Sequence, residues 1–115
     1  MKKPCIYCIK VDNYIAYIGK SIDFESRLQN HWYNLFKSDK NKYLLLKSAL
    51  FRKHSLSFWI IGEYKEEELD EKEQMWIHLL QPSLNSTFNH RNGEKLDANT
   101  FYHQIFFTTG MVEGE

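Results

Sequence analysis

Glu73 is the side chain whose position packing explains least. A helix is predicted over residues 66–80, and its apolar stripe contains Leu69, Trp76, Ile77 and Leu80. Glu73 falls within this stripe and is expected to point toward a sheet. An unpaired carboxylate there costs at least the ~1–3 kcal/mol of an unsatisfied buried polar group. Glu73 is therefore expected to be held by Arg27, by a hydroxyl of Tyr7 or Tyr17, or by a divalent cation. The alternatives are a purely structural ion pair with Arg27 or Lys20, or a slight rotation of the helix that leaves Glu73 half exposed.

Four more side chains with reactive or anion-binding chemistry lie earlier in the chain: Tyr7, Tyr17, Arg27 and His31. Arg27 precedes His31 by one turn of a predicted helix. A guanidinium is permanently charged and matches a phosphate in shape, whereas phenols and an imidazole can orient water or move its proton. A tyrosine alone is also common as a residue that only fills space in a strand, and a histidine alone is common as a packed residue of a helix. Their combination with a misplaced carboxylate favours a reactive site.

A predicted strand–turn–strand unit positions the tyrosines. Its β-branched and aromatic runs cover residues 5–11 and 14–18. Asp12 and Asn13 between the runs tolerate turn geometry. Gly19 is expected to let the backbone leave the second strand.

A helix that carries Arg27 and His31 follows, with Ser21 or Asp23 as its cap. Its apolar stripe consists of Phe24, Leu28, His31, Trp32 and Leu35. A Lys-rich connection over residues 37–42 leads to a second helix, predicted over 43–53, whose inward residues are Leu46, Ala49 and Leu50.

The second half of the chain supplies a third strand and the helix that contains Glu73. Residues 55–64 are predicted to form a largely buried strand. The helix over 66–80 has an acidic first turn, which its dipole favours, and it must end before Pro82. Residues 96–107 are predicted to form a last helix or a final strand.

These motifs resemble the signature of the GIY-YIG endonucleases. The sequence has Cys5-Ile6-Tyr7, then Tyr17-Ile18-Gly19 about ten residues later, and then Arg27 on the next helix. Cys5 stands where the family usually has glycine. The later residues Glu73, Trp76, Ile77, Pro82, Leu84 and Asn85 are similar to a second family motif. The resemblance extends from about Cys5 to Asn85.

The resemblance implies a catalytic site made of Tyr7, Tyr17, Arg27, His31 and Glu73, with Asn85 closing the site. Glu73 would be the sole protein ligand of one Mg²⁺ or Mn²⁺ ion, and Arg27 would grip the scissile phosphate. Hydrolysis of a phosphodiester needs an activated water and charge neutralisation at phosphorus. Tyr7 or His31 would take the proton of that water; a phenol with a pKa near ~10 needs nearby cations to lower it.

The charge distribution indicates a nucleic-acid partner although the net charge is zero. Residues 1–54 contain eleven Lys or Arg and four Asp or Glu, a net of +7, whereas residues 55–115 contain four and eleven, a net of −7. One phosphate-facing surface and one acidic surface would produce this asymmetry, as would chance clustering on solvated helices. The residues predicted to contact DNA phosphates are Lys20, Ser21, Lys40 and Lys42.

A chain of 115 residues has room for one core. We predict a single α+β domain with a three-stranded, mainly antiparallel sheet flanked by helices. Residues 1–88 form the nuclease-like core, and 89–115 an extension packed on it with a frayed end. The absence of a long apolar run and the two cysteines predict an intracellular protein that does not bind membranes.

The predicted function is a metal-dependent DNA endonuclease acting on duplex or branched DNA. One alternative is a nuclease-derived module that binds DNA without cutting it. Another is an interaction domain whose acidic half meets a protein. Target specificity would come from loops, from a homodimer, from the shape of the nucleic acid, or from a recognition region outside this chain.

Overall fold

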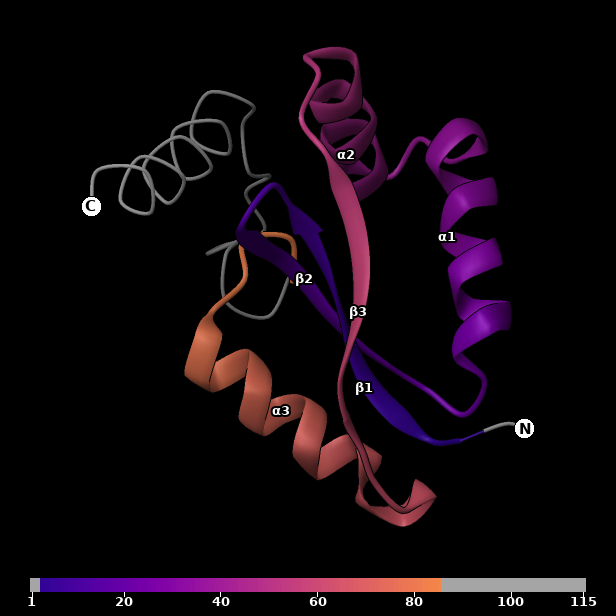
Figure 1. Cartoon of the computed structure of the whole chain (residues 1–115), viewed down its shortest axis with the longest axis vertical. Helices are drawn as coiled ribbons and strands as arrows, with labels where there is room; N and C mark the ends of the chain where they lie inside the picture. Colours follow the sequence, from indigo (N-terminus) through magenta and orange to yellow (C-terminus); the bar gives the residue numbers. More distant parts are fainter. Residues whose placement is uncertain (1–2, 86–115) are drawn as a thin grey trace.

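The computed structural model describes residues 3–85, which form a three-stranded antiparallel sheet with helices on both faces (Figure 1). The elements follow in the order β1 (Cys5–Val11), β2 (Tyr14–Ser21), α1 (Phe24–Lys37), α2 (Asn41–Phe51), β3 (Leu56–Glu63), a short 3₁₀ turn η1 (Glu66–Glu68) and α3 (Leu69–Leu80). Helices α1 and α2 lie on one side of the sheet and α3 on the other. The predicted α+β class and its antiparallel sheet are confirmed.

Strand β1 lies at the centre of the sheet, in the order β2-β1-β3, and is buried on both faces. Tyr7, Ile9 and Val11 belong to the apolar cluster under α1 and α2. Ile6 and Cys8 belong to a second cluster that contains residues of α3. Alternation along one strand therefore joins both helical layers, because successive side chains point to opposite faces.

Gly19 does not end the second strand, which corrects the prediction. Strand β2 continues to Ser21, and Gly19 pairs directly with Tyr7 of β1. A Cβ atom at Gly19 would lie 2.5 Å from the Tyr7 hydroxyl oxygen and 2.6 Å from the ring carbon that carries it. Glycine is needed there because the Tyr7 ring packs on its backbone.

Three burial predictions were wrong. Strand β3 is an edge strand and is only partly covered, with Trp59 and Ile60 exposed. Trp32 on α1 and Leu80 on α3 are each 40% exposed, since each lies at the margin of its helix's buried face. The start of the acidic helix is a 3₁₀ turn, and regular α-helix begins only at Leu69.

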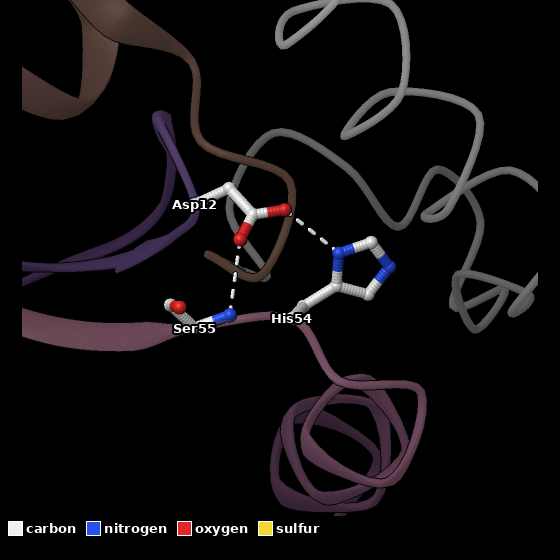
Figure 2. Close-up of polar contacts among 3 residues, drawn as sticks. All are labelled: Asp12, His54 and Ser55. Atoms are coloured by element: carbon white, nitrogen blue, oxygen red, sulfur yellow. Dashed lines mark hydrogen bonds and ion pairs between the residues drawn. The ribbon is translucent and has the colours of Figure 1, made fainter.

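A polar contact ties the β1–β2 turn to the segment between α2 and β3 (Figure 2). One carboxylate oxygen of Asp12 accepts from the backbone N–H of Ser55 at 3.0 Å, and the other lies 2.7 Å from His54 Nδ1. The Asp12 N–H donates to the Ser55 carbonyl at 2.8 Å. Asp12 has a φ of 54°, which a short polar side chain tolerates.

None of the helices within residues 3–85 has the length and apolar character needed to cross a membrane. The predicted last helix or strand over 96–107, and the boundary predicted between 88 and 89, lie outside the described residues.

Candidate active site

A buried hydrogen-bonded chain joins Tyr7, His31 and Tyr43. The Tyr7 hydroxyl oxygen lies 2.6 Å from His31 Nε2, and the Tyr43 hydroxyl oxygen lies 2.8 Å from His31 Nδ1. The three residues come from β1, α1 and α2, and each is at most 6% exposed. The His31 ring also stacks on Phe58 of β3, with ring centroids 6.2 Å apart. Both ring nitrogens of His31 therefore have partners, and its orientation is fixed from four elements.

Burial keeps the side chains of this hydrogen-bonded chain neutral. It lowers the pKa of His31 to about 4, with the charges of Lys42 and Arg27 acting in the same direction. Burial also raises the pKa of Tyr7 above that of a free phenol, and the nearby Arg27 charge only partly opposes this. Base catalysis by a phenolate needs a lowered tyrosine pKa, whereas the pKa of Tyr7 is raised. At neutral pH Tyr7 is a phenol that can accept a proton only while passing its own to His31.

A polar cleft of about 210 Å³ opens between α1 and the start of α2. Its lining includes three cationic side chains, Arg27, Lys40 and Lys42, and it contains no carboxylate. Its remaining lining residues are Tyr17, Asn30, His31, Asn34, Ser38 and Tyr43. A cavity with this charge and size suits a phosphate group. The cleft therefore brings together five of the predicted catalytic and phosphate-binding residues: Tyr17, Arg27, His31, Lys40 and Lys42.

Lys42 is held against aromatic rings at the wall of this cleft. Its Nζ lies 4.2 Å from the ring centroid of Tyr17 and 4.9 Å from that of Tyr43. Burial lowers the pKa of Lys42 to about 8, and the charges of Lys40 and Arg27 add to the effect. An arriving anion would relieve the mutual repulsion of these cations.

Glu73 lies in the other helical layer, on α3, and is half-buried. Within residues 3–85 its carboxylate has neither a hydrogen-bond partner nor an ion-pair partner. Burial raises its pKa, and the positive charges of Lys20 and Arg27 oppose the rise. Burial is the main cause that raises the pKa of Tyr17, and the negative charge of Glu73 raises it further. Glu73 thus acts electrostatically on Tyr17.

Lys20 and Ser21, predicted to contact phosphate, already have protein partners. The Lys20 ammonium forms an exposed ion pair with Asp70 on α3, and this contact raises its pKa. The Ser21 hydroxyl is buried and accepts from the N–H of Asp23 at 2.9 Å. Asp23 itself caps α1 by accepting from the N–H of Ser26. Ser21 thus shapes the entry to α1, and Lys20 links β2 to α3.

Asn85 is bonded to the outer edge of β2. Its Oδ1 accepts from the Ile18 N–H and its Nδ2 donates to the Ile18 carbonyl, both at 2.8 Å. The N–H of Leu84 donates to the Ala16 carbonyl at 2.9 Å. These bonds fix the backbone on either side of Tyr17. Asn85 therefore positions the strand from which Tyr17 reaches the cleft.

Tyr43 is a site residue that sequence reasoning missed. It is placed on a separate helix twelve residues after His31, so no periodicity relates the two. Asn30 and Asn34 were also missed, although both are one helical turn from a predicted site residue, Arg27 or His31.

Comparison with known proteins gives one family. Residues 3–92 match the model of the family described as "GIY-YIG catalytic domain". Among solved structures, a mutant of bacteriophage T4 EndoII has a TM-score of 0.61 and 23% identity, over 73% of this chain and 74% of that one. The GIY-YIG N-terminal endonuclease domain of UvrC from Thermotoga maritima, described as bound to its catalytic divalent cation magnesium, has a TM-score of 0.48 and 20% identity, over 73% and 84%. No curated protein matches the sequence.

Proposed function

Because this chain belongs to the GIY-YIG catalytic domain family and is a nuclease domain of that fold, we propose that it is a DNA endonuclease that uses one Mg²⁺ or Mn²⁺ ion. The observation that supports this most is the Glu73 carboxylate, half-buried and without a bonded partner within residues 3–85. The charges of Lys20 and Arg27 act on this carboxylate, and its own charge acts on Tyr17. A carboxylate kept in this way costs stability, which a ligand can offset.

The residues at Glu73 fit a magnesium site of the water-rich kind. Groups of three or more His, Cys, Asp or Glu side chains that could hold a metal are absent from the described part of the chain. Mg²⁺ commonly keeps several waters and takes one or two carboxylates from the protein. Glu73 would hold the ion, which would supply charge neutralisation at the phosphate and a more acidic bound water.

The cleft residues would bind and orient the substrate. Arg27 would hold the scissile phosphate as a two-pronged donor, with Lys40 and Lys42 as further cationic partners. Tyr17 would orient the attacking water. Tyr7 would accept the proton of that water while giving its own proton to His31 Nε2, since the two atoms are already 2.6 Å apart.

The charge distribution supports DNA as the partner, in duplex or branched form. Lys40, Lys42 and Arg27 belong to the half with a net charge of +7. We also propose residues 89–115 as an extension of the same domain, an intracellular location, and either a homodimer or an additional recognition region as the source of specificity. The incompletely covered edge strand β3, with Trp59 and Ile60 exposed, supports a partner on that side.

The test is cleavage of supercoiled plasmid by wild-type protein, Glu73→Gln and Glu71→Gln, with Mg²⁺, Mn²⁺ or EDTA. Glu71 is exposed on the same helix, so its variant controls for the loss of one acidic charge. We expect EDTA and Glu73→Gln each to abolish cutting, and Glu71→Gln to keep it. Both variants should unfold at the wild-type temperature. A Glu73→Gln protein that still cuts would refute the metal role.

The same protein also decides between cutting and binding alone. Salt-dependent DNA binding without EDTA-sensitive cleavage would favour the nuclease-derived binding module. Absence of both would favour an interaction domain. A panel of single-stranded, duplex and branched oligonucleotides would then define the substrate form.

A further inference from the structure

The two hydrogen bonds that join Tyr7, His31 and Tyr43 can run in either direction with the same heavy-atom positions. A neutral imidazole has one N–H and one acceptor nitrogen. In one orientation Tyr7 donates to Nε2 and Nδ1–H donates to Tyr43. In the other, Tyr43 donates to Nδ1 and Nε2–H donates to Tyr7. Only the first leaves His31 Nε2 able to take the Tyr7 proton.

Two members of this hydrogen-bonded chain line the cleft, Tyr43 and His31, and Tyr7 does not. The Tyr43 hydroxyl bonds to His31 Nδ1, and Tyr43 lies in the lining together with Arg27 and Lys42. The Asn34 side chain, also in the lining, makes a hydrogen bond that opposes the burial-driven rise in the pKa of Tyr43, as a donor to a phenol oxygen does. Tyr43 therefore has one proton to give and two competing acceptors, His31 Nδ1 and whatever occupies the cleft.

A phosphodiester anion offers only acceptor oxygens and is the stronger acceptor because it is charged. We propose that Tyr43 is a positioning residue through which a phosphate in the cleft sets the His31 tautomer, making Nε2 the acceptor of the Tyr7 proton only when substrate is bound. The bound anion takes the Tyr43 O–H, so the Tyr43 oxygen must accept from His31 Nδ1–H. This inference rests on the proposed nuclease function for its purpose, but its geometry does not depend on that function.

The proton transfers balance along this path. The attacking water gives a proton to the Tyr7 oxygen, and Tyr7 gives its own proton to His31 Nε2. His31 becomes an imidazolium whose Nδ1–H is held by the Tyr43 oxygen. Loss of that Nδ1 proton through Tyr43 to solvent in the cleft restores neutral His31 in the opposite tautomer. Return to the first orientation needs one proton to leave His31 Nε2 and one to reach Nδ1. The Nε2 proton passes to the Tyr7 oxygen while Tyr7 releases its own proton to water, and Tyr43 gives its proton to Nδ1 and regains one from solvent in the cleft.

Several groups surround the His31 ring and bear on its protonation. They come from all the elements packed against it. The charged ones are Arg27 and Lys42, and the titratable phenols are Tyr7, Tyr17 and Tyr43. Both charges are positive and keep the imidazole neutral. At neutral pH the ligand therefore changes which nitrogen carries the proton, and the charge of the ring stays zero.

The first test follows the two ring nitrogens of His31 by ¹⁵N NMR at pH 7, in wild-type protein titrated with dimethyl phosphate, a phosphodiester anion without an O–H donor. We expect a mixture of tautomers without phosphate and conversion to the Nδ1–H form as phosphate is added. Chloride at matched ionic strength should not cause the conversion. A His31 tautomer that does not respond to phosphate overturns the proposal.

The second test uses Tyr43→Phe, with Tyr33→Phe as the matched control because Tyr33 is 65% exposed on α1. We expect Tyr43→Phe to lose the His31 response to phosphate and Tyr33→Phe to keep it. Cleavage by Tyr43→Phe should slow roughly tenfold to a hundredfold, in kcat more than in KM, since positioned proton transfer is worth ~10²–10⁴ and the variant impairs it without removing Tyr7 or His31. A response retained in Tyr43→Phe refutes the role of Tyr43. A wild-type protein that cuts no DNA refutes the nuclease function alone, and the NMR titration still decides the tautomer proposal.

Discussion

Replacing Gly19 by alanine tests the contact that places Tyr7. The Cβ of Gly19→Ala would lie 2.5 Å from the Tyr7 hydroxyl oxygen, where ordinary contact begins near 3.4 Å. The phenol must then move by ~0.9 Å, in a core packed too densely to absorb the motion. Its 2.6 Å hydrogen bond to His31 would lengthen to about the limit for such bonds.

Two costs add in this variant. Overpacking a well-packed site costs ~1–3 kcal/mol. Weakening a buried hydrogen bond, so that a phenol and an imidazole lose their partners, costs another ~1–3 kcal/mol. We therefore expect the free energy of unfolding to fall by ~2–6 kcal/mol, which most domains of ordinary stability survive at 25 °C. Cleavage should fall too, because Tyr7 no longer reaches His31.

The assay is urea unfolding of a double-mutant cycle with Gly19→Ala, Tyr7→Leu and the double variant. Tyr7→Leu removes the ring that alanine would strike, so a coupling energy of ~2 kcal/mol or more is expected. Gly62→Ala on β3 is the matched control: its Cβ would meet the half-buried Tyr64 ring at 3.0 Å, a lesser overlap with a less confined side chain. The reasoning fails if Gly19→Ala is no more destabilising than Gly62→Ala, or if the cycle shows no coupling.

Three further outcomes follow from the site. Asn85→Ala leaves the Ile18 N–H and C=O without partners and should cost ~2–4 kcal/mol in urea unfolding, whereas Ser83→Ala removes a buried hydroxyl with no partner in the described chain and should be nearly neutral. His31 has a pKa of about 4 in the folded protein, against about 6.5 for a free histidine, so the unfolded chain binds more protons between these values. Stability should be complete above about pH 6.5 and fall by about 3 kcal/mol toward pH 4, a loss that is absent from His31→Gln. Lys42, with a pKa of about 8, should lose its charge at pH 9, so wild-type DNA affinity falls there and the salt slope drops by ~0.9, whereas Lys42→Arg keeps both.

Most elements of the fold could be predicted from local pattern. The alternating runs that became β1 and β2, and the capping Asp23, are local signals and were found at nearly the right residues. The sequence pattern predicts that the strand ends at Gly19, because a glycine in the sequence does not show which side chain packs against it. The exposure of β3 was missed for a related reason: strand order decides which strand lies at the edge, and strand order is not a local property.

The site divides in the same way. Each predicted side chain could be chosen because its type was unusual for its surroundings, as with Glu73 in an apolar stripe. The cleft could not be predicted, since it depends on how α1 and α2 diverge after Lys37. The pKa of Tyr7 also required the structure. Nearby cations would lower it and burial raises it, and only the degree of burial decides which effect is larger.

A single irregularity in β2 explains how one edge strand serves both layers. The register with β1 pairs Ile9 with Tyr17 and Lys10 with Ile15, so Ala16 is an extra residue in β2. Strict alternation would put Tyr14 and Tyr17 on opposite faces, because they are three residues apart. With the extra residue, both pack against the cluster under α1 and α2, while Ile15 and Ile18 pack against that of α3. The Ala16 carbonyl accepts from Leu84 and Ile18 is bonded by Asn85, so the segment after α3 holds the irregular stretch at both ends. Tyr17 can then face the cationic cleft. Lys20, three residues later, forms its ion pair with Asp70 of α3, which lies one helical turn before Glu73.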